Sequence, residues 1–147
     1  MSQKLISKLL VGVDFSEESK KALRFAISLS KQLGITDLVV VSVVKPIITS
    51  LGNMSGEAEV SDKEDMNIVS EQLQELVKAE RGDFTERIKE KVSLGSPADT
   101  LIKEIEIEKP DMVIMGNKKH GFKKGILTGS VSARVSANSP VSVLIVR

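Results

Sequence analysis

Five short apolar stretches recur along the chain, each bounded by charged or turn-forming residues. A short run that is apolar at nearly every position fits a strand buried on both faces of a parallel sheet. In the third stretch Ile88, Val92 and Leu94 are interspersed with polar residues, so this strand is expected at an edge of the sheet. The predicted strands are residues 9–13, 38–44, 88–94, 112–115 and 141–146.

Between these strands, apolar residues recur at the three-to-four-residue spacing of a helix. The first helix is predicted to start after the N-cap Ser16 and to end at Gly34, because glycine readily adopts the left-handed backbone of a helix C-terminus. Ser96 and Ser130 are N-cap candidates for two later helices, and Pro97 fits the first position of the earlier one. The expected core-facing residues are Ala22, Phe25 or Ala26, Leu29 and Leu33 in the first helix, Met66, Val69, Leu73, Leu76 and Val77 in the second, Ala98, Leu101, Ile102 and Ile105 in the third, and Val131 and Val135 in the fourth.

The alternation of strand and helix predicts an α/β fold, in which a five-stranded parallel sheet is doubly wound with helices on both faces. With 147 residues the chain is expected to form a single domain spanning residues 1–147. Residues 47–61 lose all periodicity and are predicted to form a long loop. Ligands of such sheets bind beyond the carboxyl ends of the strands, where the strand order reverses. Asp14 follows the first strand and Gly116 the fourth, so both are expected at that rim.

Composition narrows the possible functions. The formal net charge is +1 and aromatic residues make up 3% of the chain, which provides neither the charge nor the stacking surface typical of nucleic-acid binding. No apolar run is long enough to span a membrane, and the first residues lack the apolar segment of a signal peptide. The absence of cysteine suits the cytoplasm, and the single histidine, His120, excludes a multi-histidine metal site. We therefore expect a cytoplasmic protein that binds neither nucleic acid nor membrane.

A glycine-rich loop follows the fourth strand and leads into the last predicted helix. Such a loop can hold phosphate, because the first backbone N–H groups of a helix are unpaired and the helix dipole favours an anion. The sequence lacks two general phosphate-binding motifs, the P-loop and the dinucleotide fingerprint. The G-x-x-x-x-G pattern from Gly116 to Gly121 is followed by Phe122-Lys123 and not by Lys-Ser or Lys-Thr, and G-x-G-x-x-G does not occur.

The spacing of this loop resembles the pattern G-x2-G-x9-G-[ST] of the universal stress protein family. Gly116 matches the first glycine and Gly129-Ser130 match the end of the pattern, whereas Lys119 replaces the middle glycine. Further segments are similar to the strands and turns of the family, in the same order and over almost the whole chain. They are residues 9–19, 38–43, 111–116 and 140–146. The chain therefore resembles a universal stress protein of the ATP-binding type.

The resemblance implies a site for ATP or another adenine nucleotide, with or without Mg. In nucleotide-binding members, the residue at the Asp14 position contacts the nucleoside, and the residue at the Val43 position meets adenine through its backbone. Asp14 also has a plainer interpretation as a cap of the next helix, and Gly129-Ser130 as an ordinary helix start. The other implied positions are Gly12 and Val13 at the base, Met115 and Gly116 beside the ribose and phosphates, Lys118 and Lys119 in the loop, and Gly129, Ser130 and Val131 at the phosphate-holding turn.

Lys119 is the main departure from the family pattern. Where a loop needs the left-handed backbone of glycine, another residue costs about 1–2 kcal/mol, and the lysine side chain also fills space near the phosphates. In the opposite direction, an ammonium group about 4 Å from a phosphate gains about 1–4 kcal/mol. We expect the two effects nearly to cancel and to leave nucleotide binding that is real but weaker.

The resemblance implies a sensor or regulator of the stress response. An alternative is a family member with lost or weak nucleotide binding, which acts through contacts with an unknown protein partner. A catalytic role is not expected, because no general base or Walker-type metal ligand is recognisable, although slow ATP hydrolysis stays open. The last strand, Val141 to Val146, is too apolar for a bare sheet edge, and family members commonly pair through it, so a homodimer is expected.

Overall fold

The computed structural model describes residues 5–46, 57–117 and 131–147. In these ranges five parallel strands alternate with four helices and form one sheet in the order β3-β2-β1-β4-β5. The predicted α/β class is therefore confirmed, and the polar strand β3 lies at an edge as expected. The elements are β1 Lys8–Gly12, α1 Glu17–Leu33, β2 Asp37–Val44, α2 Glu57–Glu80, β3 Ile88–Leu94, α3 Pro97–Glu108, β4 Met112–Gly116, α4 Val131–Asn138 and β5 Ser142–Val146.

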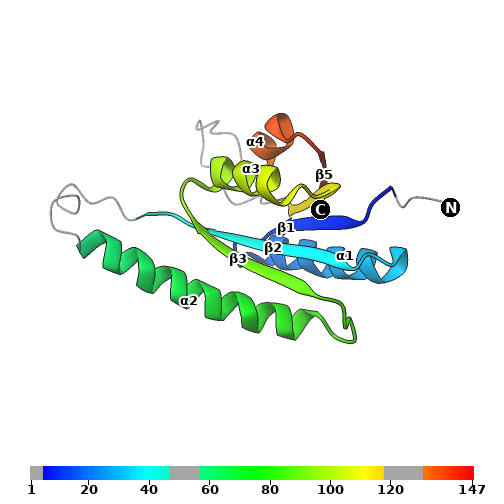
Figure 1. Ribbon diagram of the computed structural model, residues 1–147, viewed down its shortest axis with the longest axis horizontal. Helices are drawn as coiled ribbons and strands as arrows, with labels where there is room; N and C mark the ends of the chain where they lie inside the picture. Colours follow the sequence, from blue (N-terminus) through cyan, green and yellow to red (C-terminus); the bar gives the residue numbers. More distant parts are fainter. Residues whose placement is uncertain (1–4, 47–56, 118–130) are drawn as a thin grey trace.

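Helices cover both faces of the sheet, α1 and α2 on one face and α3 and α4 on the other (Figure 1). Successive residues of a strand point to opposite faces, so each face has its own apolar core. Leu9 and Val11 of β1 pack with α1 and α2, whereas Leu10 packs with α3 and α4. All three side chains are 0% exposed, because β1 is the central strand and is covered on both faces. None of the helices in the described ranges is long and apolar enough to cross a membrane.

The first helix begins and ends where the sequence predicts. Ser16 is the N-cap, and its side chain accepts a hydrogen bond from the backbone of Ser19, while Gly34 closes the helix in the left-handed conformation with φ of 66°. Of the two alternatives for the core, Ala26 is buried and Phe25 is exposed. The prediction for Leu33 was wrong, because Ser30 is the last buried residue of α1 and Leu33 is 47% exposed.

Two further predictions need correction. Residues 57–61 were predicted as loop but belong to α2, which begins at Glu57. This turn lacks apolar periodicity, yet glutamate and alanine favour a helix and acids stabilise its N-terminus. In α4, Val131 was expected to share a buried face with Val135, but Val131 is 39% exposed and Val135 is 0% exposed. The buried face of α4 is centred on Ser132 and Val135, which leaves Val131 at its margin.

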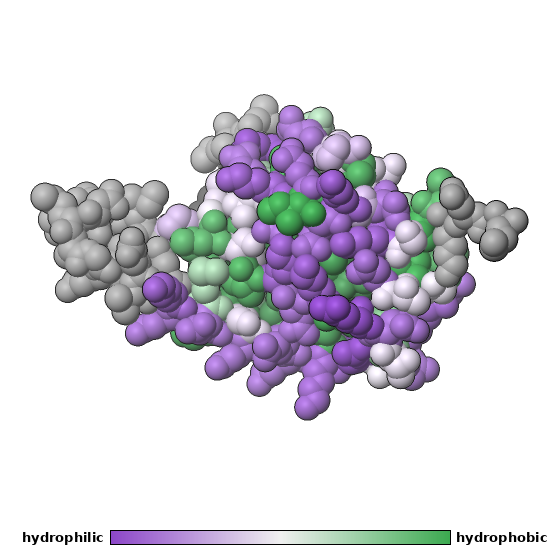
Figure 2. All heavy atoms as spheres, in the orientation of Figure 1, coloured by the Kyte–Doolittle hydropathy of each residue, from purple (hydrophilic) through white to green (hydrophobic). Residues whose placement is uncertain are grey.

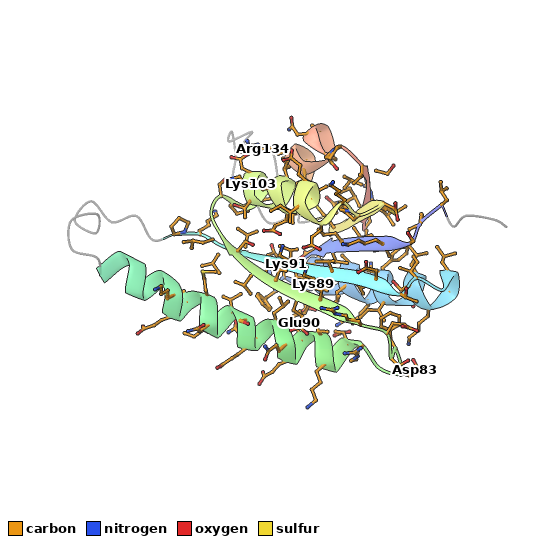
Figure 3. All side chains as sticks on the ribbon, in the orientation of Figure 1. Asp83, Lys89, Glu90, Lys91, Lys103 and Arg134 are labelled. Carbon is orange, nitrogen blue, oxygen red and sulfur yellow. The ribbon has the colours of Figure 1, made fainter. Side chains whose placement is uncertain are left out.

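Charged residues occupy the space where α3 passes beside β3. Two carboxylates of α3, Glu104 and Glu108, are each 8% exposed. Lys91 of β3 lies between them, with its Nζ 2.5 Å from Glu104 Oε2 and 2.9 Å from Glu108 Oε2. Glu108 also accepts hydrogen bonds from Lys89 Nζ at 3.0 Å and from Lys8 Nζ at 3.2 Å. Figure 3 shows Lys89 and Lys91 on the side of β3 that faces α3, so this ion network ties α3 to both β1 and β3.

The lysines change the titration of Glu108. Burial alone would raise the pKa of its carboxyl, but hydrogen bonds from Lys91, Lys89 and Lys8 outweigh burial and lower the pKa from 4.5 to about 2. The folded-state pKa therefore lies below the unfolded-state value. The resulting stabilisation is fully present above the unfolded-state pKa and is lost as the pH falls through the folded-state pKa.

We predict that Glu108→Gln lowers the free energy of unfolding at neutral pH by about 3 kcal/mol, the lower end for breaking a buried ion pair, because the lysines are partly solvated. The deficit should shrink as the pH falls from 4.5 to about 2, where Glu108 of the parent protein takes up its proton. Urea unfolding of both proteins across this range measures the difference. Glu106→Gln, on the exposed side of α3, is the matched control and should change little. A deficit that does not vary with pH would contradict the role of the Glu108 charge.

Candidate functional site

The strand order places the reversal point between β1 and β4. From β1 the chain adds β2 and β3 on one side, and β4 and β5 are added on the other. Parallel sheets bind ligands at the carboxyl ends of two such strands. In the observed register Gly12 pairs with Val41 of β2, and Val11 pairs with Ile114 of β4. Gly12 is therefore level with Met115, so the predicted residues of the two strands are neighbours.

Asp14 begins a tight turn between β1 and α1. Its Oδ1 accepts hydrogen bonds from the backbone N–H and the hydroxyl of Ser16, at 3.0 and 2.5 Å. The intervening residue Phe15 has φ of 65°, a left-handed conformation that is unusual for a bulky side chain. The carboxylate thus helps to start α1, as the plainer interpretation of Asp14 predicts. A carboxylate offers about four acceptor positions, so this role is compatible with binding a ligand as well.

The chain leaves the sheet after β1, while β2 continues to Val44. Val13 N donates to Val41 O at 2.8 Å, so the Val41 carbonyl points toward β1. Peptide groups two residues apart in a strand point the same way, so the Val43 carbonyl points to this side too, level with Asp14. The Val13 side chain is 4% exposed and packs in the core beneath α1. Val13 can therefore contact a ligand only through its backbone.

Two of the predicted site glycines also lie close against helices. A Cβ on Gly12 would lie 3.0 Å from Leu101 Cδ2 of α3. A Cβ on Gly116 would lie 2.4 Å from the Glu18 carbonyl oxygen and 2.9 Å from Ser19 N, both in the first turn of α1. Such an approach to backbone atoms is sterically forbidden. Gly116 therefore allows the end of β4 to lie against α1, whether or not a phosphate is bound nearby.

The described residues form the nucleoside half of the implied site. Lys118, Lys119, Gly129 and Ser130 lie outside the described residues. Val131 is described and is the first residue of α4. The predicted residues that the structure brings together at the carboxyl ends of β1, β2 and β4 are Gly12, Val13, Asp14, Val43, Met115 and Gly116.

Ser19 contacts the turn that carries Asp14, although no role was predicted for it. It is 5% exposed, and its Oγ accepts a hydrogen bond from Asp14 N at 3.2 Å. A signal was present in the sequence, because Ser19 occupies the same helical face as Ala22, Leu23 and Ala26. A serine on an apolar face indicates a specific hydrogen bond.

A depression of about 380 Å³ lies at the other end of the sheet and is lined in part by Gly34, Thr36, Asp83 and Thr85. It adjoins the amino ends of β2 and β3, whereas parallel sheets bind their ligands at the carboxyl ends. We therefore assign no ligand to it. Within the part of the chain that the structure describes, no group of three or more histidine, cysteine, aspartate or glutamate side chains could hold a metal ion.

The fold and the site define the class of protein: a doubly wound α/β protein with the Asp14 carboxylate at its topological switch point and the Val43 carbonyl of β2 level with it. The sequence model of the universal stress protein family matches residues 6–147. The chain belongs to the universal stress protein family.

Individual relatives agree with this assignment. Universal stress protein MJ0577 of Methanocaldococcus jannaschii is 26% identical over 156 residues, covering 97% of this chain and 96% of the relative. Its solved structure matches with a TM-score of 0.71. A universal stress protein solved in complex with cAMP matches with a TM-score of 0.70 at 22% identity, over 98% of this chain and 99% of that one. The universal stress protein from Archaeoglobus fulgidus in complex with dAMP matches with a TM-score of 0.58 at 18% identity, over 98% and 100% of the two chains.

We predict that Gly116→Ala destabilises the protein by about 3 kcal/mol, the upper end for overpacking, because the atoms that its Cβ would meet are backbone. Gly12→Ala is the matched comparison. Its Cβ would meet the end of a flexible leucine side chain, so the cost should be about 1 kcal/mol. Urea unfolding of the two variants measures the difference, and equal losses would contradict the packing role of Gly116.

Proposed function

We propose that this protein binds an adenine nucleotide, with ATP the expected form, at the carboxyl ends of β1, β2 and β4, and that binding regulates a cytoplasmic stress response. The observation that carries the proposal is the convergence of the Val43 carbonyl and Asp14 where the chain leaves the sheet after β1. The nucleotide is proposed to be a regulatory ligand and not a substrate.

The groups at this position suit the hydrogen-bonding pattern of adenosine. The exocyclic amino group of adenine is a donor, and the Val43 carbonyl is an acceptor. The ribose hydroxyls are donors, and the Asp14 carboxylate is an acceptor. Met115, which is 7% exposed, supplies a small apolar surface beside these groups, whereas Leu101 is 3% exposed and packs over Gly12. The phosphates would be held by the loop after Gly116 and by the N-terminus of α4, which favours an anion.

The ligands of the structural relatives support the choice of base. One relative is solved with cAMP and another with dAMP. These two molecules share adenine but differ in their sugar and in the bonding of their phosphate. The relatives therefore support recognition of adenine better than recognition of a triphosphate, or of the Mg that a triphosphate would bring.

A second candidate function is regulation through protein contacts without a nucleotide. It is favoured by the finding that Gly12, Gly116 and Asp14 all have structural roles in positioning α3 and α1, so none of the three requires a ligand. Mass spectrometry of small molecules released from the purified protein separates the two functions. Release of ATP, ADP or AMP supports nucleotide binding. A protein that releases none, and that binds none at millimolar concentration, supports the second candidate.

We predict that Asp14→Ala lowers the affinity for adenosine and for ATP about ten- to a hundredfold, since one hydrogen bond to a charged group contributes about 1.5–3 kcal/mol. Calorimetric titration measures the loss, with unfolding recorded on the same samples because Asp14 also helps to start α1. Asp83→Ala, which removes an exposed aspartate at the opposite end of the sheet, is the matched control and should bind like the parent protein. Unchanged affinity in Asp14→Ala would place the site elsewhere.

We further propose that the protein forms a homodimer through β5, because the two edge strands of the sheet differ in chemistry. After its first residue β5 is entirely apolar, and its side chains are only half-buried. β3 carries Lys89, Glu90 and Lys91 instead, and Figure 2 shows hydrophilic side chains along this edge and over α2. Charges on an edge strand discourage pairing with another chain, whereas an apolar edge invites it. A pair of β5 strands related by a twofold axis would cover the apolar edge.

We predict that the parent protein is a dimer at micromolar concentration and that Leu144→Lys weakens the dimer at least about tenfold, by placing like charges near the twofold axis. Val92→Lys is the matched control, because Val92 is a partly buried residue of the opposite edge strand that packs against the same core. This variant should remain dimeric. Light scattering over a dilution series measures both, and a monomeric parent protein would contradict the pairing through β5.

A further inference from the structure

The hydroxyl of Ser19 reaches back from α1 into the turn that carries Asp14. Its Oγ accepts a hydrogen bond from Asp14 N at 3.2 Å and donates one to Ser16 O at 3.0 Å. Ser16 in turn binds the Asp14 carboxylate through its backbone N–H and its hydroxyl. The backbone and the side chain of Asp14 are thus both held by serines of the next helix.

Helix capping does not account for the Ser19 hydroxyl. The N-cap of α1 is Ser16, whose Oγ accepts from the backbone N–H of Ser19, and this bond needs no side chain at position 19. The Ser16 carbonyl already accepts the helical hydrogen bond from Lys20 N at 3.0 Å. Alanine is the better helix former at a buried position of this kind. What a serine adds here is the hydrogen bond to Asp14.

Ser19 also contacts the second strand of the site. A Cβ on Gly116 would lie 2.9 Å from Ser19 N, so the end of β4 rests against this residue. Ser19 therefore touches both strand ends at the reversal point, the turn after β1 by a hydrogen bond and the end of β4 by packing. A shift of the first turn of α1 would move Asp14 relative to Gly116.

We propose that Ser19 is a positioning residue of the nucleotide site, whose hydroxyl holds Asp14 level with the Val43 carbonyl. The inference rests on the proposed function. It is strengthened by Phe15, whose left-handed backbone, with φ of 65°, is unfavourable for a bulky residue and requires surrounding contacts to maintain it. The Ser19 hydrogen bond supplies such a contact on the residue directly before it.

The first test is a double-mutant cycle with adenosine as the ligand. Ser19→Ala should lower the affinity about fivefold, the effect of one neutral hydrogen bond. In the Asp14→Ala background, Ser19→Ala should cause no further loss, because no carboxylate is left to be positioned. Ser30→Ala is the matched control. Ser30 is a buried serine of the same helix whose Oγ bonds only within the helix, to Ala26 O at 2.8 Å, and it lies away from the site.

The second test needs no ligand. Amide hydrogen exchange of Asp14 should be at least about tenfold faster in Ser19→Ala than in the parent protein, because its backbone N–H loses its acceptor. The amide of Val13 is the internal control, since its partner is Val41 O and not Ser19. Its exchange should be unchanged, as should both rates in Ser30→Ala.

The outcomes distinguish this inference from the function on which it rests. Coupled losses in the cycle, together with faster exchange at Asp14 alone, support it. Additive losses of affinity, or an unchanged Asp14 exchange rate, overturn the positioning role while leaving nucleotide binding in place. Absence of adenosine binding by the parent protein overturns the proposed function, and the inference with it.

Discussion

The end of β4 lies directly against the first turn of α1, and this contact is possible only because residue 116 has no side chain. The positions of several groups at the carboxyl ends of the strands depend on this contact. The contact fixes where the first turn of α1 lies relative to the end of β4. The residue before this turn, Ser16, in turn binds the Asp14 carboxylate. On the other face Leu101 covers Gly12 in a similar way, although with a side chain that can move. The carboxyl ends of β1 and β4 are therefore set by contacts between helix and strand, and any ligand meets groups already in place.

The two edge strands of the sheet, β5 and β3, differ in the chemistry of their surroundings. Toward β5 the strand is apolar after its first residue and is only half-buried, as the proposed dimer would require. Toward β3 the space beside α3 is filled by an ion network around Glu104 and Glu108. Charged pairs of this kind contribute less to stability than apolar packing of the same volume, but they favour one arrangement of α3 over others. Because α3 also carries Leu101, the network helps to hold Leu101 in place over Gly12.

The fold was predictable from the sequence because four of the five strands are short apolar runs, and such runs have few alternatives in a chain that alternates strand and helix. The start of α2 was not, since the turn at Glu57 forms without apolar periodicity. The sequence pattern found Gly116 and Asp14, and it offered the capping role of Asp14 because Ser16 is only two positions away. It could not show that Gly116 packs on α1, because that contact joins residues almost a hundred positions apart. Ser19 was also overlooked. Its partner is five positions earlier, but the bond exists only because Phe15 turns the backbone back on itself.

The central position of β1 has a consequence for how the protein is made. One edge of β1 pairs with β2, which follows it closely along the chain. The other edge pairs with β4, which is synthesised much later, at residues 112–116. At synthesis rates of roughly 5–20 residues per second, several seconds separate the emergence of these two partners from the ribosome. During that interval the nascent chain carries an apolar strand with one unpaired edge. Asp111 lies just before β4, and its carboxylate accepts hydrogen bonds from the backbone N–H groups of Ser7 and Lys8 at 2.8 and 2.9 Å. These bonds join the start of β1 to the start of β4. Completion of the sheet is thus a late event in translation.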